Sequence, residues 1–208
     1  MKHVKLSSFL RKEIEVVPSL GWFGLASDPP TLAHRKMVDA ALGSGLVKKV
    51  VVFPAADLPY KSFHATDFQR LDMLGAWKDE AEYTDDVIIS HFDIMRDTAM
   101  LWKDLWKKIS SFKPQVNHYL IVGSDQYLAV KKHWEGGEEL YEQAQFLIIP
   151  RAGYEITEGV PEYHKLLNVE PVEGSSSGVR SGELYDVDDK VRGYILETGL
   201  YNEVKQDD

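Results

Sequence analysis

Short apolar runs alternate with longer segments of helical periodicity along most of the chain. The runs are rich in β-branched residues and apolar at successive positions, which predicts buried strands over Leu20–Gly24, Lys49–Pro54, Asp86–Ser90, His118–Gly123 and Gln145–Pro150. Between them apolar residues recur every three or four positions, which predicts helices over Thr31–Leu46, Thr66–Glu80, Asp97–Ile109, Gln126–Ala144 and Asp189–Thr198. The alternation indicates an α/β fold, a Rossmann-like doubly wound parallel sheet of about five strands with helices on both faces.

The pattern also indicates how the chain is divided. Residues 1–12 form a polar N-terminal extension, and residues 13–208 carry no internal repeat that would argue for two domains. We therefore expect one α/β domain whose C-terminal helical part covers about residues 175–201. Before the last helix, residues 170–178 are rich in Gly and Ser and predict a loop.

Composition narrows the classes of function. The net charge of −9 argues against nucleic acid as the main partner, because phosphate contacts need clustered Lys and Arg. The absence of cysteine excludes disulfides, thiolate nucleophiles and cysteine-ligated metals. No apolar run reaches the roughly 18 residues that span a membrane, and the N-terminus lacks the run of a signal peptide. We expect a cytoplasmic protein without a membrane partner.

Ligand sites in such sheets lie at the carboxyl ends of the strands, and the first of these ends carries candidate chemistry. In GWFGLASDPPTLAHRK (residues 21–36) a strand ends near Gly24, and a helix begins near Thr31 after a proline pair. Thr31 and His34 lie one helical turn apart, so a hydroxyl and an imidazole share a face at a positive helix end. They could hold a phosphate. The same residues also fit a plain capped turn with a surface histidine.

Two other strand ends and one Ser- and Gly-rich segment add candidates. Lys61 follows the second strand, and Asp125 follows the fourth, where it could bind a ribose or cap the next helix. In EGSSSGVRSGE (residues 173–183), serines precede Arg180, an arrangement that suits either an anion site or a flexible connection. The pairs at 101/102 and 105/106 each join Leu to Trp and indicate helix packing.

Together these segments resemble the nicotinate/nicotinamide mononucleotide adenylyltransferases, which belong to the HxGH nucleotidyltransferase superfamily. The resemblance runs in order from Gly21 to Tyr201 through GWFGLASDPPTLAH (21–34), LPYK (58–61), QRLDML (69–74), IVGSD (121–125) with Trp134, IIPRAGY (148–154), SSSGVR (175–180) and VRGYILETGLY (191–201). The first segment is similar to the family's GLFGGSFDPPHLGH and the sixth to its signature SSTxIR.

Four departures bear on activity. Thr31 stands where the family has its first histidine, and Ala33 replaces a glycine. Residues 25–27, Leu-Ala-Ser, replace glycine-serine-phenylalanine, which shifts the hydroxyl by one position. Residues 93–95 replace the serine–tyrosine–threonine segment that the family associates with its pyridine substrate.

The resemblance implies transfer of AMP from ATP to nicotinate or nicotinamide mononucleotide in NAD biosynthesis, with release of pyrophosphate and Mg2+ accompanying ATP. It implies catalytic roles for His34, Thr31 and Lys61; ATP and phosphate binding by Gly24, Ser27, Ser176, Ser177 and Arg180; and substrate or ribose contacts from Asp125, Trp134 and Arg151. Two alternatives stay open: an enzyme of this fold with another phosphorylated acceptor, such as phosphopantetheine, and a non-catalytic nucleotide-binding relative. The sequence also leaves a homo-oligomer open.

Overall fold

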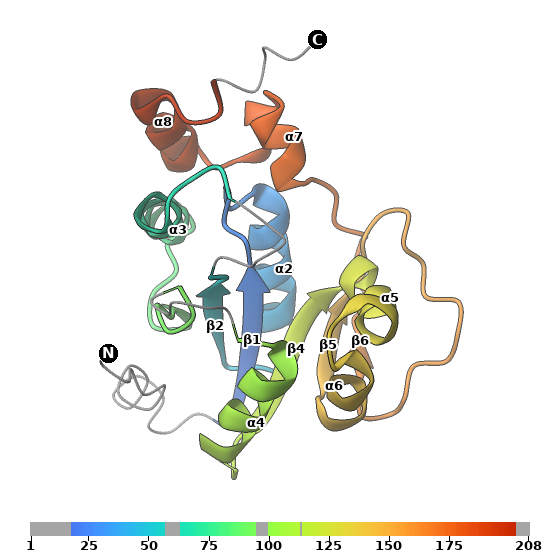
Figure 1. Ribbon diagram of the computed structural model, residues 1–208. Helices are drawn as coiled ribbons and strands as arrows, with labels where there is room; N and C mark the ends of the chain where they lie inside the picture. The colour runs from blue at the N-terminus through green and yellow to red at the C-terminus, as the bar shows by residue number, and fades with distance from the viewer. Residues whose placement is uncertain (1–17, 57–62, 95–99, 113, 203–208) are drawn as a thin grey trace.

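Six parallel strands form the central sheet in the order β3-β2-β1-β4-β5-β6 (Figure 1). The computed structural model describes residues 18–56, 63–94, 100–112 and 114–202. The strands are β1 (Ser19–Leu25), β2 (Lys49–Pro54), β3 (Val87–Ile89), β4 (Asn117–Gly123), β5 (Phe146–Ile149) and β6 (Lys165–Leu166). This confirms the predicted parallel α/β sheet, with one strand more than expected.

β1 lies at the centre of the sheet. Its residue Trp22 is in register with Val51 of β2 on one side and Leu120 of β4 on the other. The chain leaves β1 toward β2 and β3, and it returns to the opposite side of β1 for β4, β5 and β6. The strand order therefore reverses between β1 and β4, which is where doubly wound sheets leave a crevice beyond their carboxyl ends.

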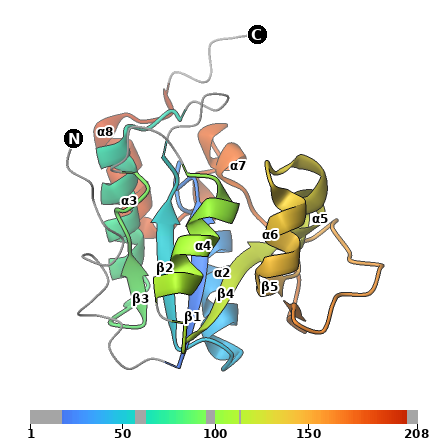
Figure 2. The ribbon, with the colours of Figure 1, turned by 60° about the horizontal axis from the view of Figure 1, so that its bottom comes forward.

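Helices cover both faces of the sheet, as predicted (Figure 2). Alternate residues of β1 point to opposite faces, so Phe23 and Trp22 belong to different apolar clusters. The Phe23 cluster takes side chains from α2 (Leu32–Gly43), α3 (Asp67–Glu80) and α8 (Asp189–Thr198). The Trp22 cluster takes them from α4 (Trp102–Phe112), α5 (Ser124–His133) and α6 (Gly137–Gln143).

The C-terminal part packs beside the carboxyl end of β1. The short helix α7 (Ser176–Arg180) and a 3-10 turn, η1 (Leu184–Asp186), lead into α8, which lies along α3 (Figures 1 and 2). Residues 176–178, expected within a loop, thus open a helix. Ser175 caps that helix by accepting a hydrogen bond from the Gly178 backbone N–H at 3.2 Å.

Three element boundaries differ from the sequence prediction. The helix expected over 126–144 is two helices, α5 and α6, because Gly136 adopts the left-handed conformation with φ 69°. The helix expected over 31–46 ends at Gly43, and the one expected from Asp97 begins at Trp102, residues 95–99 lying outside the described part of the chain.

The N-terminal extension, residues 1–12, lies outside the described residues. Among the helices that are described, none combines the length and apolar character needed to cross a membrane.

Candidate active site at the carboxyl ends of β1 and β4

A pocket of about 500 Å³ opens at the crevice between β1 and β4. Its wall is built from the end of β1, the first turn of α2, the start of α5 and the segments that precede α4 and α7. Six of the residues predicted from sequence line it: Gly24, His34, Asp125, Trp134, Arg151 and Ser176. Strand ends far apart in sequence therefore converge as the sheet topology requires.

Thr31 and His34 form a capping box at the start of α2. The backbone N–H of Thr31 donates to His34 Nδ1 at 3.0 Å, and the Thr31 hydroxyl lies 2.9 Å from the same nitrogen. Because Nδ1 accepts the backbone N–H, the proton of the neutral ring belongs on Nε2. Within the described part of the chain, no residue forms a hydrogen bond with His34 Nε2. His34 lines the pocket, whereas Thr31 is fully buried behind it.

The surroundings keep His34 neutral. Its pKa falls from 6.5 to about 4, first because burial disfavours the charged ring and second because the positive charge of Arg151 opposes protonation; Asp125 acts weakly in the other direction. At neutral pH the ring is thus a neutral hydrogen-bond donor through Nε2.

Arg151 joins the end of β5 to the segment before α7. Its Nη2 donates to the Gly174 carbonyl at 2.6 Å, and its backbone N–H donates to the Ser124 hydroxyl at 2.9 Å. Its Nε lies 4.0 Å from the Asp125 carboxylate. Arg151 therefore supplies positive charge to the pocket from a fixed position, with Asp125 beside it.

Two tryptophans form an aromatic wall of the pocket. Trp102 and Trp134 stack with ring centroids 6.3 Å apart and planes 27° apart. The Trp102 ring also lies against Gly24, where a Cβ atom would come within 2.0 Å of Trp102 Cζ2. Trp106, by contrast, lies in the apolar core. The sequence predicted that Trp102 and Trp106 serve helix packing. This is right for Trp106 and incomplete for Trp102, which also lines the pocket.

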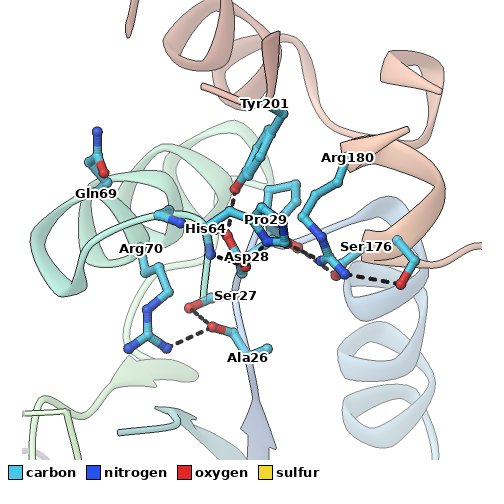
Figure 3. A network of polar contacts seen from close by, with 12 residues as sticks. Ala26, Ser27, Asp28, Pro29, His64, Gln69, Arg70, Ser176, Arg180 and Tyr201 are labelled. Carbon is cyan, nitrogen blue, oxygen red and sulfur yellow. Dashed lines mark hydrogen bonds and ion pairs between the residues drawn. The ribbon is translucent and has the colours of Figure 1, made fainter. Parts of the chain in front are cut away.

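The predicted phosphate residues of α7 contact the loop after β1 (Figure 3). Ser176 donates its hydroxyl hydrogen to the Pro29 carbonyl at 2.8 Å, and Arg180 Nη1 donates to the Asp28 carbonyl at 2.6 Å. Arg180 Nη2 also donates to the Ser177 hydroxyl at 3.1 Å. The three side chains are thus brought together beside the start of α2.

Two other predicted residues, Ser27 and Lys61, are not among the residues that line the pocket in the described structure. Ser27 is fully buried, and its hydroxyl donates to the Ala26 carbonyl at 2.7 Å, so in this conformation it does not face the pocket. Lys61 lies outside the described residues, as does the rest of LPYK.

Sequence reasoning missed Arg70 and Asp28. Arg70 is fully buried on α3 and donates to the Ala26 carbonyl at 3.0 Å (Figure 3). It also donates to the Ala55 carbonyl at 2.6 Å, so it fixes the loops that follow β1 and β2. Asp28 is a buried carboxylate in the loop after β1. Both lie in segments that resemble the family, Arg70 in QRLDML (69–74) and Asp28 in GWFGLASDPPTLAH (21–34). The resemblance did not predict what their side chains contact.

Asp93 is also missing from the predicted site. Its buried carboxylate accepts backbone N–H groups of Ala56 at 3.2 Å and Met100 at 3.3 Å, and it lines the pocket. It stands at the start of the segment that departs from the family pattern, so the departure adds a carboxylate to the wall of the pocket.

Comparisons with known proteins identify the family of the chain. A family profile described as cytidylyltransferase-like matches residues 26–182. A "Probable nicotinate-nucleotide adenylyltransferase" of Herpetosiphon aurantiacus is 27% identical over 88% of this chain and 98% of its own length. One of the same description from Campylobacter fetus subsp. fetus is 32% identical over 76% of this chain and 83% of its own.

A solved structure shares the fold. The nicotinic acid mononucleotide adenylyltransferase of Plasmodium falciparum, complexed with NaAD, superposes with a TM-score of 0.77 at 22% identity, over 88% of this chain and 97% of the other. The chain belongs to the cytidylyltransferase-like family of nucleotidyltransferases and groups there with the nicotinate-nucleotide adenylyltransferases.

Proposed function

We propose that the chain transfers the adenylyl group of ATP to the phosphate of nicotinate mononucleotide and releases pyrophosphate. The observation that carries the proposal is the His34 ring, held by Thr31 through Nδ1 so that Nε2–H is available in a pocket at the switch point of the sheet. The names of the relatives support the choice of nicotinate as the base of the acceptor. Nicotinamide mononucleotide is the near alternative.

The chemistry needs no nucleophile from the protein. An oxygen of the acceptor phosphate attacks the α-phosphorus of ATP; a new P–O bond forms, and the bond from the α-phosphorus to pyrophosphate breaks. Negative charge moves onto the phosphoryl oxygens and the leaving group. His34 Nε2–H donates to an α-phosphoryl oxygen, where a preorganised donor stabilises this charge. Thr31 acts through His34, because its backbone N–H and hydroxyl hold the ring.

The remaining predicted residues divide between the two substrates. Arg180, Ser176 and Ser177 bind the β- and γ-phosphates of ATP, with Gly24 and Ser27 shaping the loop beside them. Asp125, Trp134 and Arg151 contact the nucleotide or pyridine side of the pocket. Lys61 neutralises phosphate on the acceptor side.

Mg2+ accompanies ATP in this proposal. Among the described residues, no group of three or more His, Asp or Glu side chains is placed to hold a metal ion. We propose that the ion is bound by the ATP phosphates and by water. Mg2+ would supply positive charge on the phosphates, while the side chains position them.

A pyrophosphate-release assay tests the proposal directly. The purified chain is given ATP and Mg2+ with nicotinate mononucleotide, nicotinamide mononucleotide or phosphopantetheine in separate reactions. We expect turnover with the pyridine nucleotides and the highest kcat/KM with nicotinate mononucleotide. A preference for phosphopantetheine would show that it, and not a pyridine mononucleotide, is the acceptor. ATP binding without turnover for any acceptor would indicate a non-catalytic relative, for which Leu25, Ala26 and Ala33 are the sequence evidence.

A further inference from the structure

The buried Asp28 carboxylate connects three parts of the chain (Figure 3). Its Oδ1 accepts the Tyr201 hydroxyl hydrogen at 2.9 Å and the Ala65 backbone N–H at 3.1 Å. Its Oδ2 accepts the His64 backbone N–H at 3.0 Å. Only 2% of Asp28 is exposed, so these donors take the place of water around the carboxylate. One side chain thus joins the loop after β1 to the segment before α3 and to the turn after α8.

Two residues at or beside the Asp28–Tyr201 contact have unusual backbone conformations. Tyr201 has φ 67° and Ser27 has φ 51°, and both are non-glycine residues in the left-handed region. Such conformations are unfavourable for residues with a Cβ and persist where surrounding contacts enforce them. The Tyr201 ring is partly buried against the core, and its hydroxyl also lies 3.9 Å from Met73 Sδ. The side chain is therefore held on both its apolar and its polar side.

The loop that Tyr201 contacts carries the groups assigned to catalysis and ATP binding. Asp28 lies three residues before Thr31, which begins α2 and holds His34. The backbone carbonyl of Asp28 accepts Arg180, and the carbonyl of Pro29 accepts Ser176. A displacement of this loop would move all of these groups relative to the pocket.

We infer that the Asp28–Tyr201 hydrogen bond positions the phosphate-binding groups: Tyr201, which lies outside the pocket lining, and Asp28 are positioning residues for ATP. The inference rests on the proposed function for its kinetic readout. The turn after α8 then influences the affinity for ATP through Asp28, although Tyr201 does not contact the substrate.

The test compares two Tyr→Phe variants of the full chain. Tyr201→Phe removes the hydroxyl from Asp28 and keeps the ring in the core. Tyr194→Phe is the matched control, because its hydroxyl donates to the Asp72 carboxylate at 3.2 Å between α8 and α3, away from the loop after β1. Each variant is measured for thermal unfolding, for kcat and KM of ATP, and for the Kd of ATP by calorimetry.

We expect Tyr201→Phe to raise the KM and Kd of ATP roughly 10-fold, the scale of losing one hydrogen bond to a charged group, with the KM of the pyridine nucleotide changed less. Tyr194→Phe should keep wild-type values. Asp28→Ala, which removes the acceptor of Tyr201 together with that of His64 and Ala65, should give at least as large a defect. Adding Tyr201→Phe to it should cause little further loss, because the partner of the Tyr201 hydroxyl is already absent.

Several outcomes would overturn the inference. One is Tyr201→Phe with wild-type Kd and KM for ATP, even if it unfolds at a lower temperature, since the contact would then serve stability alone. Another is an equal loss of ATP affinity in Tyr194→Phe. If the wild type binds ATP but turns over no acceptor, the proposed function fails, while the Kd comparison still decides this inference. A wild type that binds no ATP would overturn both.

Discussion

At the scale of single residues, His34 shows how a helix cap can set the chemistry of a site. The capping box that begins α2 uses Nδ1 as acceptor, and this fixes which nitrogen carries the proton. The substitution of the family's first histidine by threonine leaves this arrangement in place, because the cap needs a backbone N–H and a small polar side chain. The departure at Thr31 is therefore compatible with a working donor at His34.

Replacement of His34 tests its role in the reaction. His34→Ala should lower kcat/KM roughly 10²-fold or more, the scale for losing a donor that stabilises a developing oxyanion. His34→Gln is the folding control, because Gln at this position preserves a capping box. Steady-state pyrophosphate release and thermal unfolding of both variants provide the measurement. Wild-type turnover in His34→Ala would remove the residue from the chemistry.

The lowered pKa of His34 also predicts a pH dependence of stability. The pKa is about 4 in the folded chain and 6.5 in the unfolded chain, so between these values the unfolded chain binds more protons. Stability from this group is present above pH 6.5 and is lost as the pH falls to 4. The change is at most about 3 kcal/mol, and contact of the ring with water reduces it.

Urea unfolding of wild type and His34→Gln at a series of pH values isolates this effect from the carboxylates that titrate in the same range. Between pH 6.5 and 4, the stability of the wild type should fall relative to that of His34→Gln. A constant difference across the range would show that His34 titrates normally.

Gly24 provides a test of the aromatic wall. Gly24→Ala places a methyl group on the Trp102 ring, so we expect a loss of about 1–3 kcal/mol in unfolding free energy and a raised KM for the pyridine nucleotide. Gly75→Ala in α3 is the control, because no atom lies within 4 Å of its added Cβ. If Gly24→Ala behaves like Gly75→Ala in denaturant titrations and kinetics, Trp102 does not constrain this position.

At the scale of elements, periodicity predicted the strands β1 to β5 and the helices that cover the sheet. The elements that it missed are short or broken. β6 has two residues, too few for a period. The five-residue helix α7 lies within the C-terminal helical part expected over about 175–201, but its first three residues were predicted to form a loop because the run is rich in Ser and Gly. The break between α5 and α6 depends on the conformation of Gly136, which the apolar pattern does not encode.

The candidate site also has a part that the sequence predicted and a part that it did not. The rule that ligands bind at strand ends, together with the resemblance, selected six residues that the structure brings to one pocket. The contacts of Asp28 and Arg70 could not be predicted, because they join segments distant in sequence whose approach depends on the packing of α3 and α8. The hydrogen bond of Arg180 to the Asp28 carbonyl likewise joins segments distant in sequence.

At the scale of the whole molecule, binding of ATP should stabilise the fold, because a ligand that binds the folded chain and not the unfolded chain shifts the unfolding equilibrium. At 100 times its Kd, a ligand adds about 2.7 kcal/mol, which for a chain of 208 residues raises Tm by about 5–10 °C. Differential scanning fluorimetry with ATP and Mg2+ measures this shift. Arg180→Ala should reduce it at equal ATP concentration, and an undiminished shift would place the triphosphate elsewhere.

The span of the contacts around Asp28 has a consequence for synthesis on the ribosome. Asp28 and Tyr201 are 173 positions apart, and Arg180 is 152 positions from Asp28. A nascent chain can complete β1 and α2 early, but Arg180 and Tyr201 leave the exit tunnel only after translation has moved well beyond each of them. Since distant contacts form late and slowly, nucleotide binding should appear abruptly once Tyr201 has left the tunnel rather than grow with chain length.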